Sequence, residues 1–137
     1  MAEEAKVSQA NQKYFILLII TDGIINDMQK TIDQIVRGSS LPMSIVIVGV
    51  GSDDFESMDI LDADEVPLYS MKYKKNMESD IVQFVPFREF KHNPAQLARE
   101  TLDEIPRQLL DFFRKNNINP LPQTEAGRRA IQQKLTN

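Results

Sequence analysis

The stretch YFILLIITDG, residues 14–23, decides the fold of this chain. The run from Phe15 to Thr21 is aliphatic, aromatic or β-branched throughout and carries no charge. It is too short to span a membrane and is typical of a strand that is buried on both faces of a parallel sheet. The run stops at Thr21, Asp22 and Gly23. Because ligand sites in open α/β sheets lie just outside the carboxyl ends of the strands, Asp22 is the first candidate for a functional role.

Composition limits the class of protein. The 137 residues are the length of one domain, and 42% apolar with 26% charged residues is typical of a soluble globular chain. A net charge of −4 indicates no general affinity for nucleic acid or for anionic membranes. The absence of cysteine excludes disulfides and thiolate zinc sites, and the single histidine, His92, excludes a multi-histidine metal site. We expect a cytoplasmic protein, since residues 1–13 are polar and predict a disordered leader rather than a signal peptide.

Two further apolar runs complete the predicted sheet. Apolar residues at helical spacing follow the first strand over residues 28–36, with Asn26 as a capping residue and Gly38 just past the helix end. Residues 44–50 then predict a second buried strand, which gives a strand–helix–strand unit with parallel strands. Residues 80–87 predict a third strand.

The remaining segments are helical or irregular. Residues 66–79 show little periodicity and predict an exposed loop. Asn93 begins a helix with Pro94 at its first position, and Pro106 should kink this helix or divide it in two. Residues 118–137 are polar and predict a tail, so residues 14–117 form the expected domain.

Several short motifs resemble known kinds of site. The strand followed by TDGIIND superficially resembles the nucleophile motif of haloacid-dehalogenase-type phosphatases, but the position of the nucleophilic aspartate is Ile20. Gly49 and Gly51 lack the third glycine of a dinucleotide fingerprint, because Asp54 stands there. The acidic run from Asp53 to Glu65 lacks the spacing of a calcium-binding EF-hand loop and predicts a solvated surface. Asp22 is left as either a metal ligand or a helix cap.

Four sequence blocks carry a family resemblance. LLIITDG, SLPMSIVIVGVG, DIVQFVPFREF and EIPRQLLDFF are similar, in order and in spacing, to the von Willebrand factor A-type domain of copines. The resemblance covers residues 14–120. It implies a Rossmann-like α/β fold, a mostly parallel sheet with helices on both faces, of which about three strands, the C-terminal half, are present here. It also implies a domain that recruits target proteins and that has a metal-ion-dependent adhesion site at its strand tips.

The sequence departs from the copine pattern at that site. Asp22 matches only the last of the three metal-binding loops, and no Asp-x-Ser-x-Ser motif occurs. We therefore expect at most a partial, weak magnesium or manganese site at Asp22, with Thr21, Gly23, Gly49 and Gly51 as a binding rim. In copines calcium acts through two C2 domains that bind phospholipid membranes, and these are absent from this chain. The resemblance thus implies calcium-dependent membrane recruitment only for a full-length relative, and membrane contact only through the missing domains.

The expected function is that of a non-enzymatic protein-interaction module of a copine-like adaptor. Without the strand that pairs with the first strand in the whole domain, the strand at residues 14–20 should present an unpaired apolar edge, open to a partner or to self-association. The alternatives are a metal-dependent phosphohydrolase that uses Asp22, which predicts phosphatase turnover that Asp22→Asn abolishes, and an inactive truncated fragment. Nucleic acid is not an expected partner.

Overall fold

A three-stranded parallel sheet forms the centre of the molecule. The structure is a computed structural model that describes residues 1–22, 25–51, 55, 58, 60–61, 66–122 and 124–125. The strands β1 (Phe15–Thr21), β2 (Met43–Gly49) and β5 (Val82–Pro86) lie in the order β1-β2-β5. All pairing is parallel, with Phe15 opposite Met43 and Ile45 opposite Val82. The predicted parallel α/β sheet is confirmed, and its strands differ from the predicted ranges by one or two residues at their ends.

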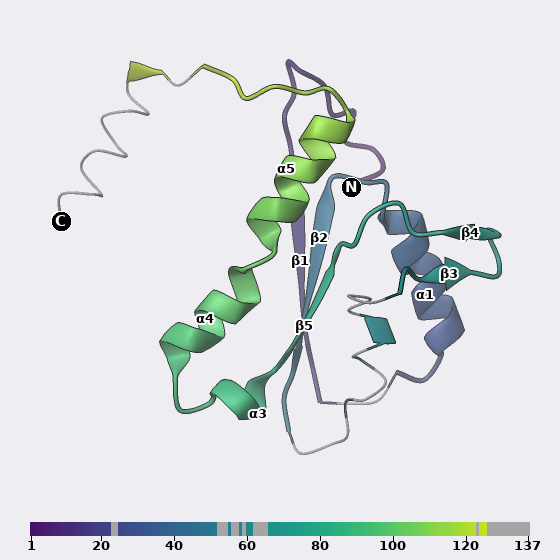
Figure 1. The fold of residues 1–137 in the computed structure, drawn as a ribbon, viewed down its shortest axis with the longest axis vertical. Coiled ribbons are helices and arrows are strands. Elements are labelled where there is room, and N and C mark those ends of the chain that lie inside the picture. The colour runs from purple at the N-terminus through teal and green to yellow at the C-terminus, as the bar shows by residue number, and fades with distance from the viewer. Residues whose placement is uncertain are drawn as a thin grey trace.

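Helices cover both faces of this sheet, as predicted (Figure 1). On one face α1 (Met28–Gly38) packs its buried Ile35 and Val36 into a core that includes Ile47 and Phe84 of the sheet. On the other face lie α3 (Phe87–Phe90), α4 (Pro94–Leu102) and α5 (Ile105–Lys115). The strand β2 is covered on both faces, and its side chains are accordingly buried or half-buried along the whole strand.

The ends of α1 differ from the prediction. Asp27, not Asn26, is the N-cap, and its Oδ1 accepts a hydrogen bond of 3.0 Å from the backbone N–H of Lys30. Gly38 is still helical and Ser39 is the C-cap, so the predicted helix end was one residue early. Gly38 is buried, and a Cβ added there would lie at ordinary contact distance from Ile81 and Met43, so neither a left-handed turn nor close packing requires glycine at this position.

The predictions for the C-terminal helices are confirmed. Asn93 caps α4, its Oδ1 accepting a hydrogen bond from the N–H of Gln96 at 3.1 Å. The helix α4 ends at Leu102 and α5 begins at Ile105, so the region around Pro106 does divide the helix in two. Proline is tolerated there because the first turn of a helix has no partner for its backbone N–H groups.

The segment predicted as an exposed loop contains a β-hairpin. Its strands are β3 (Tyr69–Ser70) and β4 (Lys75–Asn76), paired antiparallel. Ser70 is fully buried, and its hydroxyl donates a hydrogen bond of 2.6 Å to the carboxylate of Asp33 on α1. The loop prediction was wrong because strands of two residues leave no periodic pattern, whereas this contact with α1 holds them in place.

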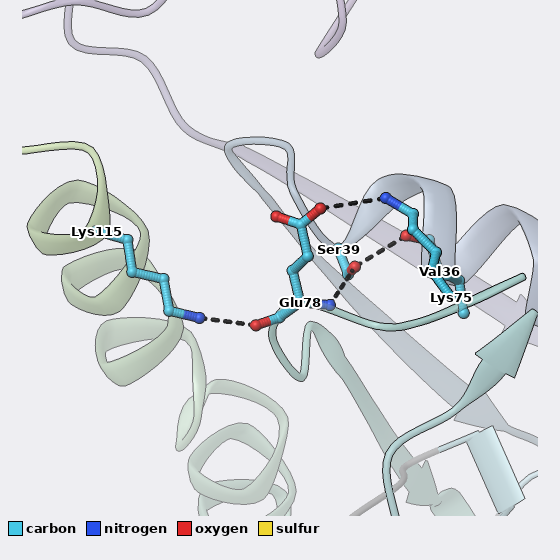
Figure 2. A network of polar contacts seen from close by, with 5 residues as sticks. All are labelled: Val36, Ser39, Lys75, Glu78 and Lys115. Atoms are coloured by element: carbon cyan, nitrogen blue, oxygen red, sulfur yellow. Dashed lines mark hydrogen bonds and ion pairs between the residues drawn. The ribbon is translucent and has the colours of Figure 1, made fainter. Parts of the chain in front are cut away.

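Backbone and side-chain groups at the base of the hairpin connect three elements (Figure 2). The N–H of Glu78 donates to Oγ of Ser39 at the end of α1, and that hydroxyl donates to the carbonyl of Val36. Lys115 of α5 donates to the carbonyl of Glu78 at 2.8 Å. Lys75 of β4 forms an ion pair with the Glu78 carboxylate. The hairpin base is thereby tied to helices on both sides of the sheet.

The N-terminal segment contacts the far end of the described chain. Gln9 and Gln12 both donate from their side-chain amides to the carbonyl of Asn119. Glu3 forms an ion pair with Arg37 of α1. Both side chains are half exposed, and exposed pairs of this kind contribute little to stability. The domain boundaries expected after residues 13 and 117 stay predictions. Within the part of the chain that the structure describes, no helix combines the length and apolarity that crossing a membrane would require.

Candidate functional site

The strand tips bring some of the predicted site residues together. Thr21 and Gly49 are opposite one another in the register of β1 and β2, and the N–H of Val50 donates to the carbonyl of Thr21 at 2.8 Å. Asp22 follows at the same edge, and its side chain is exposed. Gly23 lies outside the described residues. The topology thus places Thr21, Asp22 and Gly49 side by side, as the parallel sheet requires.

The two glycines of the predicted rim differ in role. Gly49 is buried, and a Cβ there would come within 3.0 Å of the rings of Phe55 and Phe84. Its lack of a side chain makes room for those two rings, whose centroids are 5.6 Å apart. Gly51 is exposed with φ +105°, a backbone conformation that favours glycine. Of the two, Gly51 is therefore the one whose backbone is exposed at this edge.

The described residues at these tips do not fit a tight divalent-cation site. Magnesium prefers six oxygen ligands in near-octahedral geometry. Nowhere in the described ranges do three histidine, cysteine, aspartate or glutamate side chains group in a way that could hold a metal ion. Asp22 thus contributes a single exposed carboxylate, and no catalytic step is derived through a metal at this place.

A second candidate site is the strand β1 itself. Its five consecutive aliphatic residues, Ile16 to Ile20, are each between 39% and 66% exposed. It is the edge strand of the sheet and pairs only with β2 among the described strands. The predicted apolar edge is thus confirmed. The first interpretation of this run, a strand buried on both faces, is wrong for this chain, because α1 and α5 cover β2 and β5 and leave β1 open.

Exposed apolar residues occur on both faces of β1. Leu17 and Ile19 are aligned with Ile45 and Ile47 of β2 and face the same side as α1. Since side chains alternate along a strand, Ile16, Leu18 and Ile20 face the opposite side, that of α5. Exposure of contiguous apolar residues is common at interaction surfaces.

A cavity lies beside β1 on the α1 side. It has a volume of about 650 Å³. Its walls come from β1, β2, α1 and the segment after β2: Leu17, Ile19, Thr21, Ile25, Asn26, Asp27, Lys30, Thr31, Gln34, Ile35, Gly38, Met43, Ile45, Ile47, Met58 and Leu61. Charge is confined to Asp27 and Lys30, which neutralise one another in an ion pair of 2.7 Å. No local sequence pattern predicts this cavity, because its walls come from elements that are distant along the chain.

A buried polar chain fixes the other end of β1. Tyr14 OH is 2.9 Å from Oγ of Ser44 in β2, and Ser44 donates in turn to Oε1 of Gln108 in α5. Gln108 then donates to Glu104 at 3.0 Å. Burial raises the pKa of Tyr14, an effect that its hydrogen bond with Ser44 partly offsets. This chain of bonds holds β1 in register with the sheet while its middle is left exposed.

Comparison with known proteins assigns the family. A sequence model of the copine family matches residues 1–121. Copine-D of Dictyostelium discoideum is 53% identical over 116 residues, which are 85% of this chain and 22% of that protein. Copine-A of the same organism is 52% identical over 115 residues, 84% of this chain and 19% of its own length. Protein BONZAI 1 of Arabidopsis thaliana is 43% identical over 122 residues, 89% of this chain and 21% of its own.

The matched region includes the whole sheet and every helix described above, and it reaches further toward the N-terminus than the blocks of the sequence resemblance. The chain spans about a fifth of the length of the curated relatives that it matches. The parallel three-stranded sheet with helices on both faces agrees with a partial von Willebrand factor A-type fold. The chain therefore belongs to the copine family.

Proposed function

We propose that this chain is a non-enzymatic protein-interaction module of a copine-like, calcium-dependent phospholipid-binding adaptor, and that it binds its partner through β1. The observation that carries the proposal is the run of five exposed aliphatic residues, Ile16 to Ile20, on an edge strand. A cytoplasmic location, with membrane recruitment by calcium in a longer relative, belongs to the same proposal.

The exposed surface defines what a partner must supply. The free edge of β1 calls for a strand that pairs with its backbone, a common mode of protein recognition. The two exposed faces call for apolar side chains on both sides of that strand. Burial of each of these side chains would contribute about 1 kcal/mol, taken as roughly half of a full aliphatic burial. A strand flanked by helices meets both demands.

A second copy of the chain meets only one of these demands. Two β1 strands related by a two-fold axis would pair edge to edge and extend the sheet to six strands. Leu17 and Ile19 on one face, and Leu18 on the other, would still be open to solvent, since edge pairing adds no covering layer. Self-association through residues 14–20 is therefore the weaker use of this surface, and a partner of different structure is the stronger one.

Site-specific photo-crosslinking tests the proposal. A benzophenone side chain at position 18, in the middle of β1, should capture a defined set of proteins in a cell extract. The double variant Ile16→Lys, Ile20→Lys in the same background should abolish that capture, because it places charge on the binding strand. Light scattering on the same samples measures how much of the association is between copies of the chain.

The matched control uses Leu102→Lys with Leu121→Lys. These leucines are as exposed as the β1 residues, 56% and 54%, and the charge added is the same. Capture at position 18 should survive in the control. Identical capture in the two double variants, or the same proteins captured from position 102, would contradict the proposal.

A further inference from the structure

The hairpin β3–β4 presents a basic and aromatic tip. The residues from Tyr69 to Lys75 read YSMKYKK, with three lysines, two tyrosines and a methionine. Ser70 points inward to Asp33, whereas Tyr69, Met71, Lys72, Lys74 and Lys75 are all exposed. Met71 is exposed by 69%, an unusual position for an apolar side chain at the end of a turn. Figure 1 shows the hairpin beside α1, away from the side of the sheet that α4 and α5 cover.

The tip stands on a fixed base. Asp33 on α1 accepts hydrogen bonds from the hydroxyl of Ser70 and from the backbone of Lys72. Oγ of Ser70 also accepts a bond of 3.0 Å from the N–H of Tyr73. Glu78 ties the other end of the hairpin to α1 and α5 (Figure 2). The turn is thus preorganised, and a ligand that meets it gains affinity because little order has to be created on binding.

Lys74 has a backbone conformation that lysine does not favour. Its φ is +52°, in the left-handed region that glycine or asparagine occupies at lower cost. A strained backbone at a non-glycine residue is a reason to look for a functional constraint. Next to it Lys72 lies over the ring of Tyr73, with Nζ 5.4 Å from the ring centroid. The positive charges of the turn are therefore held at the tip together with the exposed aromatic and apolar groups.

We propose that this tip contacts the headgroup layer of an anionic lipid bilayer directly, without calcium. Tyrosine rings and lysine side chains are favoured at membrane interfaces, where the apolar part of each is buried and the polar end stays in water. The tip is a convex protrusion, and the cavities described in this structure are lined by other residues. A tip outside these cavities fits the surface of a bilayer, whereas a small ligand needs a pocket. The inference goes beyond the proposed function and departs from the expectation that membrane contact is only indirect.

The charge of the whole chain does not oppose this contact. The net charge is −4, but residues 66–79 hold three lysines and one acid, Glu78. Screening at physiological ionic strength limits the reach of each charge to about 8 Å, so the lipid responds to the local balance. A lysine next to an anionic membrane strengthens binding by about fivefold. The tip alone thus gives weak binding, which becomes effective where another part of a longer protein already holds the chain near the membrane.

Vesicle flotation tests the proposal, because aggregates sink and only vesicle-bound protein rises. The probe is a vesicle of phosphatidylcholine with phosphatidylserine, in buffer that contains a calcium chelator. The double variant Lys72→Gln, Lys74→Gly should weaken binding by about 25-fold at low ionic strength, from two lysines at about fivefold each. Glycine at position 74 relieves the strained backbone, so the variant keeps the fold. The matched control, Lys13→Gln with Lys91→Gln, removes the same charge from exposed positions elsewhere and should bind as the original chain does.

The insertion of the tip has its own readout. The chain contains no tryptophan, so Met71→Trp reports on the tip alone. Its emission should shift to the blue with phosphatidylserine vesicles and stay unchanged with pure phosphatidylcholine vesicles.

The proposal would be overturned by no flotation with anionic vesicles, by equal loss in the two lysine variants or by an unshifted tryptophan emission. Displacement by free phosphoserine or inorganic phosphate would also overturn it, because it would indicate a pocket for a small anion. Tip-dependent binding of polyglutamate in place of vesicles would assign the tip to an acidic protein and also overturn it. The β1 variants described above should not change flotation, so this proposal and the proposed function can fail separately.

Discussion

At the scale of single residues, Asp33 determines where the hairpin lies. It is buried on α1, and its carboxylate accepts hydrogen bonds from Ser70 and Gln29. The bond from Ser70 holds the pKa of Asp33 below its usual range, more strongly than burial raises it, and the bonds from Gln29 and from the backbone of Lys72 add to the effect. The ionised form of Asp33 is therefore the form that the folded chain favours.

This shift predicts a specific pH dependence of stability. A carboxyl group with a lowered folded pKa stabilises the fold above its unfolded pKa of about 3.9, and the contribution is lost as the pH falls through the folded value. Asp33→Asn should accordingly lower the urea midpoint at about pH 7, and the difference from the original chain should shrink under acid conditions. In a Ser70→Ala background the substitution should have a smaller effect. A difference that stays constant on acidification would contradict this origin.

At the scale of elements, the bonds from Tyr14 through Ser44 to Gln108 join β1, β2 and α5. Ser44 is 1% exposed, and its hydroxyl serves both neighbours. The rings of Phe112 and Phe113 lie against Tyr14, with centroids 6.1 and 6.3 Å away. The aromatic contact and the hydrogen bonds together hold α5 on the face of the sheet that carries Leu18.

We predict that Ser44→Ala destabilises the fold by about 1–3 kcal/mol, because it leaves the amide oxygen of Gln108 buried without its partner. Tyr14→Phe should cost less, since it removes one half-buried hydroxyl and leaves the bond between Ser44 and Gln108 intact. Urea unfolding followed by circular dichroism measures both. Equal losses in the two variants would show that the bond to Tyr14, rather than the bond to Gln108, carries the effect.

At the scale of the whole molecule, the strands β2 and β5 of the sheet are covered, whereas the edge strand β1 is exposed. The core lies between α1, β2, β5 and the segment around Phe55 and Leu61, while β1 remains largely exposed. The hairpin lies beyond α1, away from that exposed strand (Figure 1). The proposed partner binding at β1 and the proposed lipid contact at the hairpin therefore use separate surfaces.

The strand tips lead to a prediction about metal ions. Asp22 provides one exposed carboxylate, so we expect magnesium or manganese to bind weakly at best. Because a ligand stabilises a fold only when its concentration exceeds its dissociation constant, about 1 mM of either ion should leave the unfolding temperature almost unchanged. A thermal scan by circular dichroism, with Asp22→Asn as the control, checks this. A clear upward shift that Asp22→Asn abolishes would restore Asp22 as a metal ligand.

The local sequence pattern was enough to predict the strands of the main sheet, the borders of the long C-terminal helices and the family resemblance. The apolar runs predicted all three strands of the sheet, Asn93 and Pro106 predicted the borders of α4 and α5, and the blocks around DIVQFVPFR predicted the copine resemblance. These features are encoded in neighbouring residues, whose spacing and backbone preferences act before any distant contact forms. The exposed apolar edge of β1 was also predicted, from the copine resemblance.

Only the tertiary structure decided how distant residues meet. In the sequence, Ser70 is an ordinary serine in an aperiodic segment. In the fold it lies beside Asp33, which is 37 residues earlier in the chain. The sequence predicts Gly49 as part of a binding rim, but in the fold the rings of Phe55 and Phe84 fill the space beside it. The hairpin, the cavity beside β1 and the exposed tip depend on such long-range contacts, which propensity and periodicity do not encode. The sequence by itself determined the strands of the main sheet, the long helices and the family, and the packing of those elements decided which residues are buried and which are exposed.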